Sequence, residues 1–76
     1  MKITQLIGSN NKALNIEENG INTLQSYDTK ICFVKDGELF KHSEYEAYLK
    51  NNKHSNTTNR HVKLFCALHN VKPIKF

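Results

Sequence analysis

Two dipeptides with a strong turn preference, Asn19-Gly20 and Asp36-Gly37, most constrain how this chain can fold. Asn, Asp and Gly tolerate the positive φ that both central residues of a type I′ turn adopt, so each dipeptide predicts a tight hairpin. The stretch between them, residues 21–35, carries the strongest strand signals in the chain, INTLQSYDTKICFVK. The chain is therefore predicted to form a small antiparallel sheet around this stretch.

Shorter segments on either side supply further strands. Met1–Ile7 alternates weakly and predicts a first strand or a short arm, and the turn cluster Gly8–Asn11 follows it. Ala13–Ile16 predicts a second strand before the Asn-Gly turn. Beyond the Asp-Gly turn, Glu38–Lys41 predicts a short returning strand.

The central stretch predicts a strand with apolar side chains on both faces. Strict alternation points Ile31 and Phe33 one way and Cys32 and Val34 the other. Such a strand belongs in the middle of a sheet that a helix covers on at least one side. Ser26–Thr29 interrupts the run with residues that bond to their own backbone, which predicts a bend, a bulge or a tight turn.

A short helix is predicted over about residues 44–51. Ser43 and Glu46 have the spacing of a capping box, in which Ser43 caps the first turn and Glu46 reaches back. Large side chains then recur on one helical face: Tyr45, Tyr48 and Leu49.

A C-terminal helix is predicted over about residues 57–69, with its cap within Ser55–Thr58. An apolar stripe follows helical spacing, with Val62 widening it: His61, Leu64, Phe65 and Leu68. Asn70, which tolerates the left-handed conformation, predicts the helix end. Ile74 and Phe76 are expected to hold the tail against the core.

The fold class predicted is α+β: a single domain over residues 1–76, with a sheet of three to five strands and one or two helices packed on it. A chain of 76 residues builds extended binding surfaces more easily than deep cavities. No stretch resembles a signal peptide or a membrane span, so a soluble, cytoplasmic protein is expected. Cys32 and Cys66 are expected as free thiols, with a bridge between them as the alternative.

The net charge of +4 is unevenly distributed. Residues 1–46 contain all seven acidic residues and five lysines. Residues 47–76 contain no acid and six bases: Lys50, Lys53, Arg60, Lys63, Lys72 and Lys75. A concentrated positive field attracts polyanions, of which nucleic acid is the commonest in a cell. The alternative is that these bases only keep a small domain soluble.

No enzyme signature is present, and neither cofactor nor metal is predicted. The chain lacks phosphate-loop, dinucleotide, zinc-protease and nucleophile-elbow motifs. His61 and His69 lie two helical turns apart, about 12 Å, which is too far to share one ion. Cys66 would lie near a helix C-terminus, which raises the pKa of a thiol and makes it a poor nucleophile.

The start of the C-terminal helix is the candidate site. A helix N-terminus offers free N–H groups and partial positive charge to an anion. The nucleic-acid- or anion-binding residues predicted around it are Lys50, Lys53, Thr57, Thr58, Arg60, His61 and Lys63. The alternative is that the threonines are caps, the bases are solvated and His61 packs on the sheet. Three tyrosines are open to the same choice, between stacking on bases and lining the core: Tyr27, Tyr45 and Tyr48.

Two segments, LQSYDT at 24–29 and HSNTTNRHVKLF at 54–65, resemble a family of short bacteriophage and prophage proteins of unknown function. The positions that match its strand and helix-start motifs are Ser26, Tyr27, Thr29, Ser55, Thr57, Thr58, Arg60, His61 and Phe65. Lys53-His54 departs from the aromatic that the family prefers before Ser55, and residues 44–52 form a longer connection. The resemblance implies a phage-type origin and a sheet with a helix, but no activity.

These observations together predict a small non-enzymatic accessory protein that binds nucleic acid through its basic C-terminal third. The alternative is an inhibitor that binds an acidic surface of a host protein. Homodimer formation is a further possibility, because a second copy would enlarge so small a core.

Overall fold

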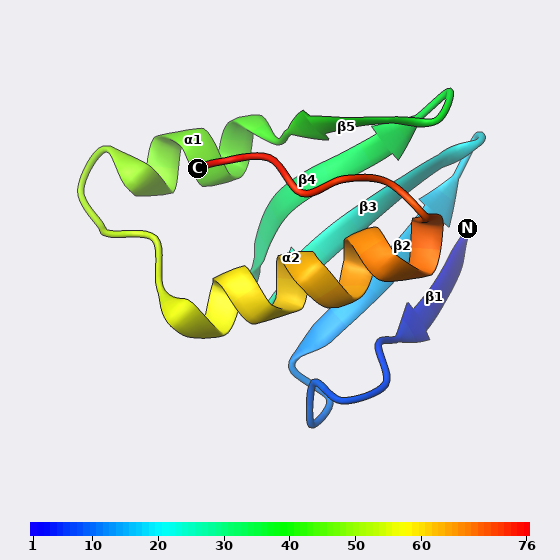
Figure 1. Ribbon diagram of the computed structural model, residues 1–76, viewed down its shortest axis with the longest axis horizontal. Coiled ribbons are helices and arrows are strands. Elements are labelled where there is room, and N and C mark those ends of the chain that lie inside the picture. Colours follow the sequence, from blue (N-terminus) through cyan, green and yellow to red (C-terminus); the bar gives the residue numbers. More distant parts are fainter.

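The computed structural model describes residues 1–76 and has five strands followed by two helices. The elements are β1 (Lys2–Gln5), β2 (Ala13–Glu18), β3 (Ile21–Ser26), β4 (Thr29–Lys35), β5 (Glu38–Lys41), α1 (Ser43–Leu49) and α2 (Asn56–His69). The strands form one antiparallel sheet in the order β1-β2-β3-β4-β5, a meander in which each strand pairs with its neighbours in sequence (Figure 1). The predicted α+β class is confirmed.

The predicted turns join these strands. Asn19 and Gly20 have φ of 56° and 79°, and Asp36 and Gly37 have 52° and 77°, as a type I′ hairpin requires. The interruption within residues 21–35 is a third hairpin, with Tyr27 at φ 55° between β3 and β4. Local turn chemistry therefore determines the meander.

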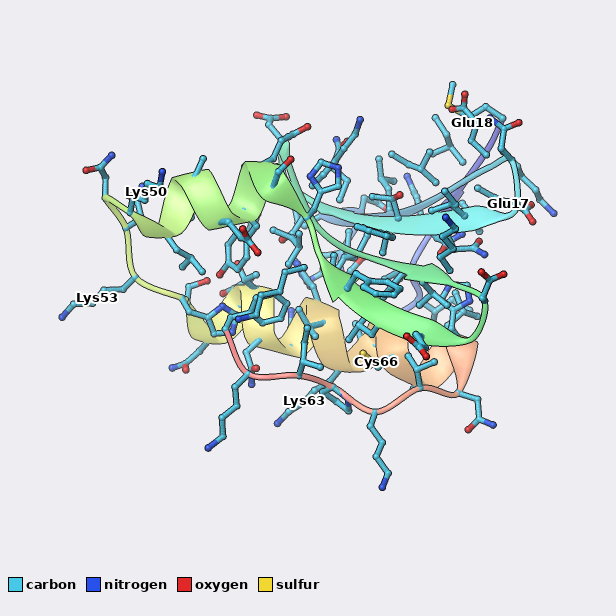
Figure 2. The ribbon with its side chains drawn as sticks, turned by 90° about the horizontal axis from the view of Figure 1, so that it is seen from above. Glu17, Glu18, Lys50, Lys53, Lys63 and Cys66 are labelled. Carbon is cyan, nitrogen blue, oxygen red and sulfur yellow. The ribbon has the colours of Figure 1, made fainter.

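Helix α2 lies across one face of the sheet, and α1 packs against β4 beyond the edge of α2 (Figure 1). The chain after α2 runs back along the same side and ends beside α1. Ten buried apolar residues fill the space between sheet and helices: Leu6, Ala13, Leu24, Ile31, Cys32, Val34, Tyr45, Val62, Phe65 and Cys66. The opposite face carries no helix (Figure 2). The sheet thus has a covered face and an open face.

Alternation in β4 is broken, which corrects the predicted orientation of Ile31. The pairing of β3 with β4 shifts between Leu24 and Gln25, and this β-bulge leaves Ile31 without a partner in the register. Ile31 and Cys32 are consequently both buried on the covered face, whereas Phe33 lies on the open face and stacks on Phe40.

The start of α1 also differs from the prediction. His42, not Ser43, is the N-cap: its backbone is extended, and its Nδ1 accepts a hydrogen bond from the Glu44 backbone N–H at 3.1 Å. The predicted capping box between Ser43 and Glu46 is therefore wrong, since Ser43 is already the first helical residue.

Helix α2 begins and ends where the sequence indicates, but its buried face is rotated. Ser55 is the N-cap and Asn70, at φ 55°, the left-handed C-cap. Leu68 is 58% exposed, so its assignment to the apolar stripe is wrong. The buried side chains are Thr58, His61, Val62, Phe65 and Cys66. The buried face of α2 therefore includes Thr58 and Cys66, which were not predicted there, and excludes Leu68.

The C-terminal tail packs as predicted. The Phe76 ring contacts Tyr45 edge-to-face, with centroids 5.2 Å apart, and stacks on His54 at 5.3 Å. The tail consequently follows α2 back toward α1. Neither helix has the length and apolar character that crossing a membrane would require.

Candidate nucleic-acid interface

Helix α2 presents a polar stripe on the side away from the sheet. Asn56, Arg60, Lys63 and Ala67 are all exposed and follow one another at spacings of four, three and four residues, which places them on one helical face. This face continues the sequence-predicted pair Arg60 and Lys63 along about three turns of helix. No acidic side chain lies on it.

The loop before α2 and the tail after it add cations. Lys50 and Lys53 are exposed at one end of the helix layer, and Lys63 projects from the side opposite the open face (Figure 2). Lys72 and Lys75 are exposed on the tail, which returns alongside α2. We call the six exposed bases the basic helix surface: Lys50, Lys53, Arg60, Lys63, Lys72 and Lys75.

These bases have no acidic neighbour in sequence. Residues 47–76 contain no Asp or Glu that could pair with them. Lys41, on β5, adds a seventh cation nearby, with its Nζ 5.7 Å from the centre of the Phe76 ring. The loop after α1, helix α2 and the tail therefore carry exposed positive charge and no acid, whereas α1 itself carries the exposed Glu44 and Glu46.

The hydroxyls at the start of α2 serve the helix itself. The Ser55 Oγ accepts a hydrogen bond from the Thr58 backbone N–H at 3.0 Å and donates one to the Thr58 Oγ1 at 3.0 Å. Thr58 is only 9% exposed, whereas Thr57 is exposed and makes no hydrogen bond through its side chain. Of the two predicted threonines, only Thr57 belongs to the surface.

His61 is fully buried and lies outside the basic helix surface. Its Nδ1 is 2.7 Å from the Ser26 Oγ, a contact that joins the end of β3 to α2, and its Nε2 has no hydrogen-bond partner. Burial, and secondarily the positive charge of Arg60, lowers the pKa of His61 below its ordinary value. His61 is therefore neutral at pH 7 and fixes the position of α2 on the sheet.

A second polar contact braces the loop before α2. The Tyr45 hydroxyl is hydrogen-bonded to the His54 Nδ1, and His54 Nε2 lies 3.3 Å from the Asn59 Oδ1. Tyr45 is buried and lines the core, whereas Tyr27 and Tyr48 are 55% and 40% exposed. These two tyrosines line a small cavity of about 110 Å³ between the β3–β4 turn and the helices.

A third set of polar contacts, which is partly buried, attaches the far end of α2 to the sheet. His69 Nε2 donates to the Asn15 Oδ1 at 2.6 Å, and Asn15 Nδ2 donates to the Asn22 Oδ1 at 3.0 Å. Burial lowers the pKa of His69, and the Glu17 carboxylate partly opposes the effect. His61 and His69 thus bind different strands, and no three potential metal ligands come together in the structure.

Both cysteines are free and buried between sheet and helix. Burial, and secondarily the neighbouring Cys66, raises the pKa of Cys32 to about 12, and burial also raises the pKa of Cys66. A protonated thiol is a weak nucleophile, which fits core packing at both positions.

Lys72, Lys75 and Lys41 were not predicted as members of the site. The acid-free composition of residues 47–76 was the available signal for the first two. Lys41 gave no such signal, because only the returning tail brings it close to the C-terminal residues.

The model of a family of unknown function, DUF8033, matches residues 1–75. The chain belongs to this family. No curated protein and no solved structure matches it. The match spans the sheet and both helices, and the function of the family is unknown.

Proposed function

We propose that this DUF8033 protein binds the sugar-phosphate backbone of nucleic acid through its basic helix surface, without catalysing a reaction. The observation that carries the proposal is the set of six exposed bases within residues 47–76, a segment that contains no acidic residue. Neutralising phosphates with such bases releases condensed counterions, which supplies most of the affinity of sequence-independent binding.

The side chains divide the work by their chemistry. The planar Arg60 guanidinium suits a bidentate contact with one phosphate, and the lysines act as mobile point charges along the strand. Thr57 adds a neutral hydroxyl at the helix start. Arg60 and Lys63 are the only charged side chains on the exposed stripe, which gives few donors for reading base edges and predicts weak sequence discrimination.

A role as a phage-type accessory protein is part of this proposal. It is supported by the resemblance of the Ser26–Thr29 and Ser55–Phe65 segments to short phage proteins. A small surface binder fits such a role, since the longest dimension of the chain is 31 Å, close to one turn of B-form DNA.

Fluorescence anisotropy of labelled DNA and RNA oligonucleotides, measured over a salt series, tests the proposal. If about five bases each neutralise one phosphate, log K falls against log salt with a slope of about −4.5. Affinity then drops roughly 500-fold between about 50 and 200 mM salt. No binding at low salt, or an affinity independent of salt, would contradict the proposal.

A matched pair of variants locates the contact. Arg60→Ala with Lys63→Ala should reduce the magnitude of the slope by about 2 and weaken binding at every sequence tested. Lys12→Ala with Lys30→Ala removes the same charge outside the basic helix surface and should leave the slope nearly unchanged. Equal losses for the two pairs would show that net charge, not this surface, controls binding.

The same exposed cations would also suit an acidic surface on a host protein, which is the second candidate. A pull-down from nuclease-treated lysate separates the two. Retention of one stoichiometric protein that is lost on Arg60→Ala with Lys63→Ala, combined with no oligonucleotide binding, would favour the inhibitor role.

A further inference from the structure

The open face of the sheet carries an apolar row that crosses every strand. The register places five residues side by side: Ile3, Ile16, Thr23, Phe33 and Phe40. Ile3 is 56% exposed and Phe40 40% exposed, and the Phe33 and Phe40 rings stack with centroids 5.3 Å apart. An antiparallel sheet with one solvated face normally has polar side chains there, so this row is unusual.

Mostly polar residues flank the apolar row on both sides. On one side the outward-facing residues of the register are Glu18, Ile21, Lys35 and Glu38, and on the other they are Gln5, Leu14, Gln25 and Lys30. An apolar centre with a mainly polar rim is the usual anatomy of a protein interface. Two acids and two lysines balance each other on this face, so it does not attract phosphates as the helix side does.

We infer that the open face binds the open face of a second copy of this chain, forming a dimer with a two-fold axis parallel to β3. That axis places β2 of one copy over β4 of the other, and β1 over β5, as in aligned packing of two sheets. The inference goes beyond the proposed function and uses none of its residues.

The charges on the face select this axis. It places Glu18 opposite Lys35 of the partner subunit, and the symmetry makes this pair twice. The other two-fold axis within the plane, perpendicular to the strands, would place Lys35 opposite Lys30 of the partner subunit. Like charges across an interface are destabilising, so the axis parallel to β3 is preferred.

The apolar row is self-complementary about the same axis. Ile16 faces Phe33 of the partner subunit, and Ile3 faces Phe40 of the partner subunit. Ile16 also borders a hollow of about 250 Å³ on this face, lined with Ile21, Thr23 and Lys30 among others, and Phe33 of the partner subunit lies above it. The ring of Phe33 of the partner subunit can therefore fill the hollow beside Ile16.

The available area sets the expected strength. Five strands spaced about 4.8 Å apart and three outward rows about 7 Å apart give a face of roughly 500 Å² before side-chain relief is counted. A standard interface buries about 800 Å² from each partner. The dimer should therefore be reversible, with a dissociation constant in the micromolar range.

Sedimentation equilibrium of the full chain, from about 5 to 500 micromolar, tests the inference. The weight-average mass should rise with concentration from 8.8 kDa toward twice that value. Ile16→Thr with Phe33→Thr, which keeps β-prone residues, should weaken the association at least tenfold. Leu68→Gln removes a more exposed apolar side chain on α2, outside the open face, and should have no effect. A mass of 8.8 kDa at every concentration would overturn the inference, as would loss of the dimer on Leu68→Gln alone.

Charge exchange keeps the test independent of folding defects. Glu18→Lys and Lys35→Glu should each weaken the dimer about tenfold, and the two changes in one chain should restore it to within about threefold of wild type. Failure of the double exchange to restore association would exclude this two-fold arrangement. Loss of oligonucleotide binding on Ile16→Thr with Phe33→Thr, in a protein that stays monomeric, would identify the open face as a nucleic-acid platform instead.

Discussion

The two sides of this molecule have opposite surface chemistry. The last 30 residues of the chain carry six exposed bases and no acid on the helix side, whereas the open face presents an apolar row with balanced charges beside it. One thin core, ten buried apolar residues between sheet and helices, separates them. We propose a different partner for each side: a polyanion for the helix side and a matching apolar surface for the open face.

Three polar contacts beneath the helices hold α2 and the loop before it in place on the sheet. Ser26–His61 and Asn15–His69 attach the two halves of α2 to the sheet. Tyr45–His54 fixes the loop that carries Lys50 and Lys53. These contacts position the helix and loop that carry the cations. His61 is fully buried, so its role is structural.

The largest expected effect separates the covered face from the open face. Leu24 is fully buried under the helices, so Leu24→Ala should lower the free energy of unfolding by about 3 kcal/mol. Ile16→Ala, on the open face, should cost about 1 kcal/mol in the dilute monomer, and more as the protein concentration rises. Urea unfolding at two concentrations measures both changes. Equal costs at both positions would contradict the distinction between the faces.

The Ser26–His61 contact gives the next largest effect. His61→Leu leaves the buried Ser26 hydroxyl without a partner and should cost about 1–3 kcal/mol. Adding Ser26→Ala should recover most of that loss, because two apolar groups replace a bonded pair. The same urea measurement checks the pair. A double variant less stable than His61→Leu alone would show that the contact is not the reason for the loss.

The buried His61 and the half-buried His69 also predict how stability depends on pH. Burial lowers the pKa of His61 and of His69 in the folded state below the ordinary value of 6.5. At a pH between the folded and unfolded pKa values, the unfolded chain binds more protons than the folded chain. The contribution of these histidines to the free energy of unfolding is therefore fully present above about pH 6.5 and is lost as the pH falls below that value. Melting temperature from pH 8 to 5 measures this fall. The double variant Ser26→Ala with His61→Leu should show a shallower decrease than wild type, and an unchanged slope would exclude His61 as a contributor.

A smaller effect is expected at the start of α2. Ser55→Ala removes the N-cap and should cost about 1 kcal/mol, whereas Thr57→Ala, whose hydroxyl bonds nothing in the chain, should cost far less. Thermal unfolding of both variants gives the comparison. Oligonucleotide affinity should change little in Ser55→Ala under conditions where the protein is folded, because Ser55 is not one of the bases on the surface.

Most of the fold follows from local chemistry. Asn19-Gly20 and Asp36-Gly37 determine two hairpins without help from distant residues, and Ser55 and Asn70 mark the ends of α2 in the same local way. The orientation of Ile31 was not predictable, because a bulge between two strands decides it. The role of His42 was missed because the usual rules for helix caps name Ser and Thr rather than His.

The candidate site was less predictable than the fold. The acid-free C-terminal third identified Lys50, Lys53, Arg60 and Lys63, all of which are exposed. His61 is a polar residue next to Arg60 in the sequence and was predicted to lie on the same surface. It is buried instead, in contact with Ser26, 35 residues away in the chain. The apolar row on the open face could not be predicted from the sequence either, because it consists of one residue from each of five strands and depends on their register.

Sedimentation velocity of the chain with a fluorescent DNA oligonucleotide tests the separation of the two sides most directly, since one run reports both bound DNA and protein mass. Arg60→Ala with Lys63→Ala should weaken DNA binding, with a shallower dependence on salt, and keep the concentration-dependent dimer. Ile16→Thr with Phe33→Thr should lose the dimer, while each monomer still binds DNA with a steep dependence on salt. If both variants lose the same property, or each loses the property assigned to the other side, the account of two separate surfaces is contradicted.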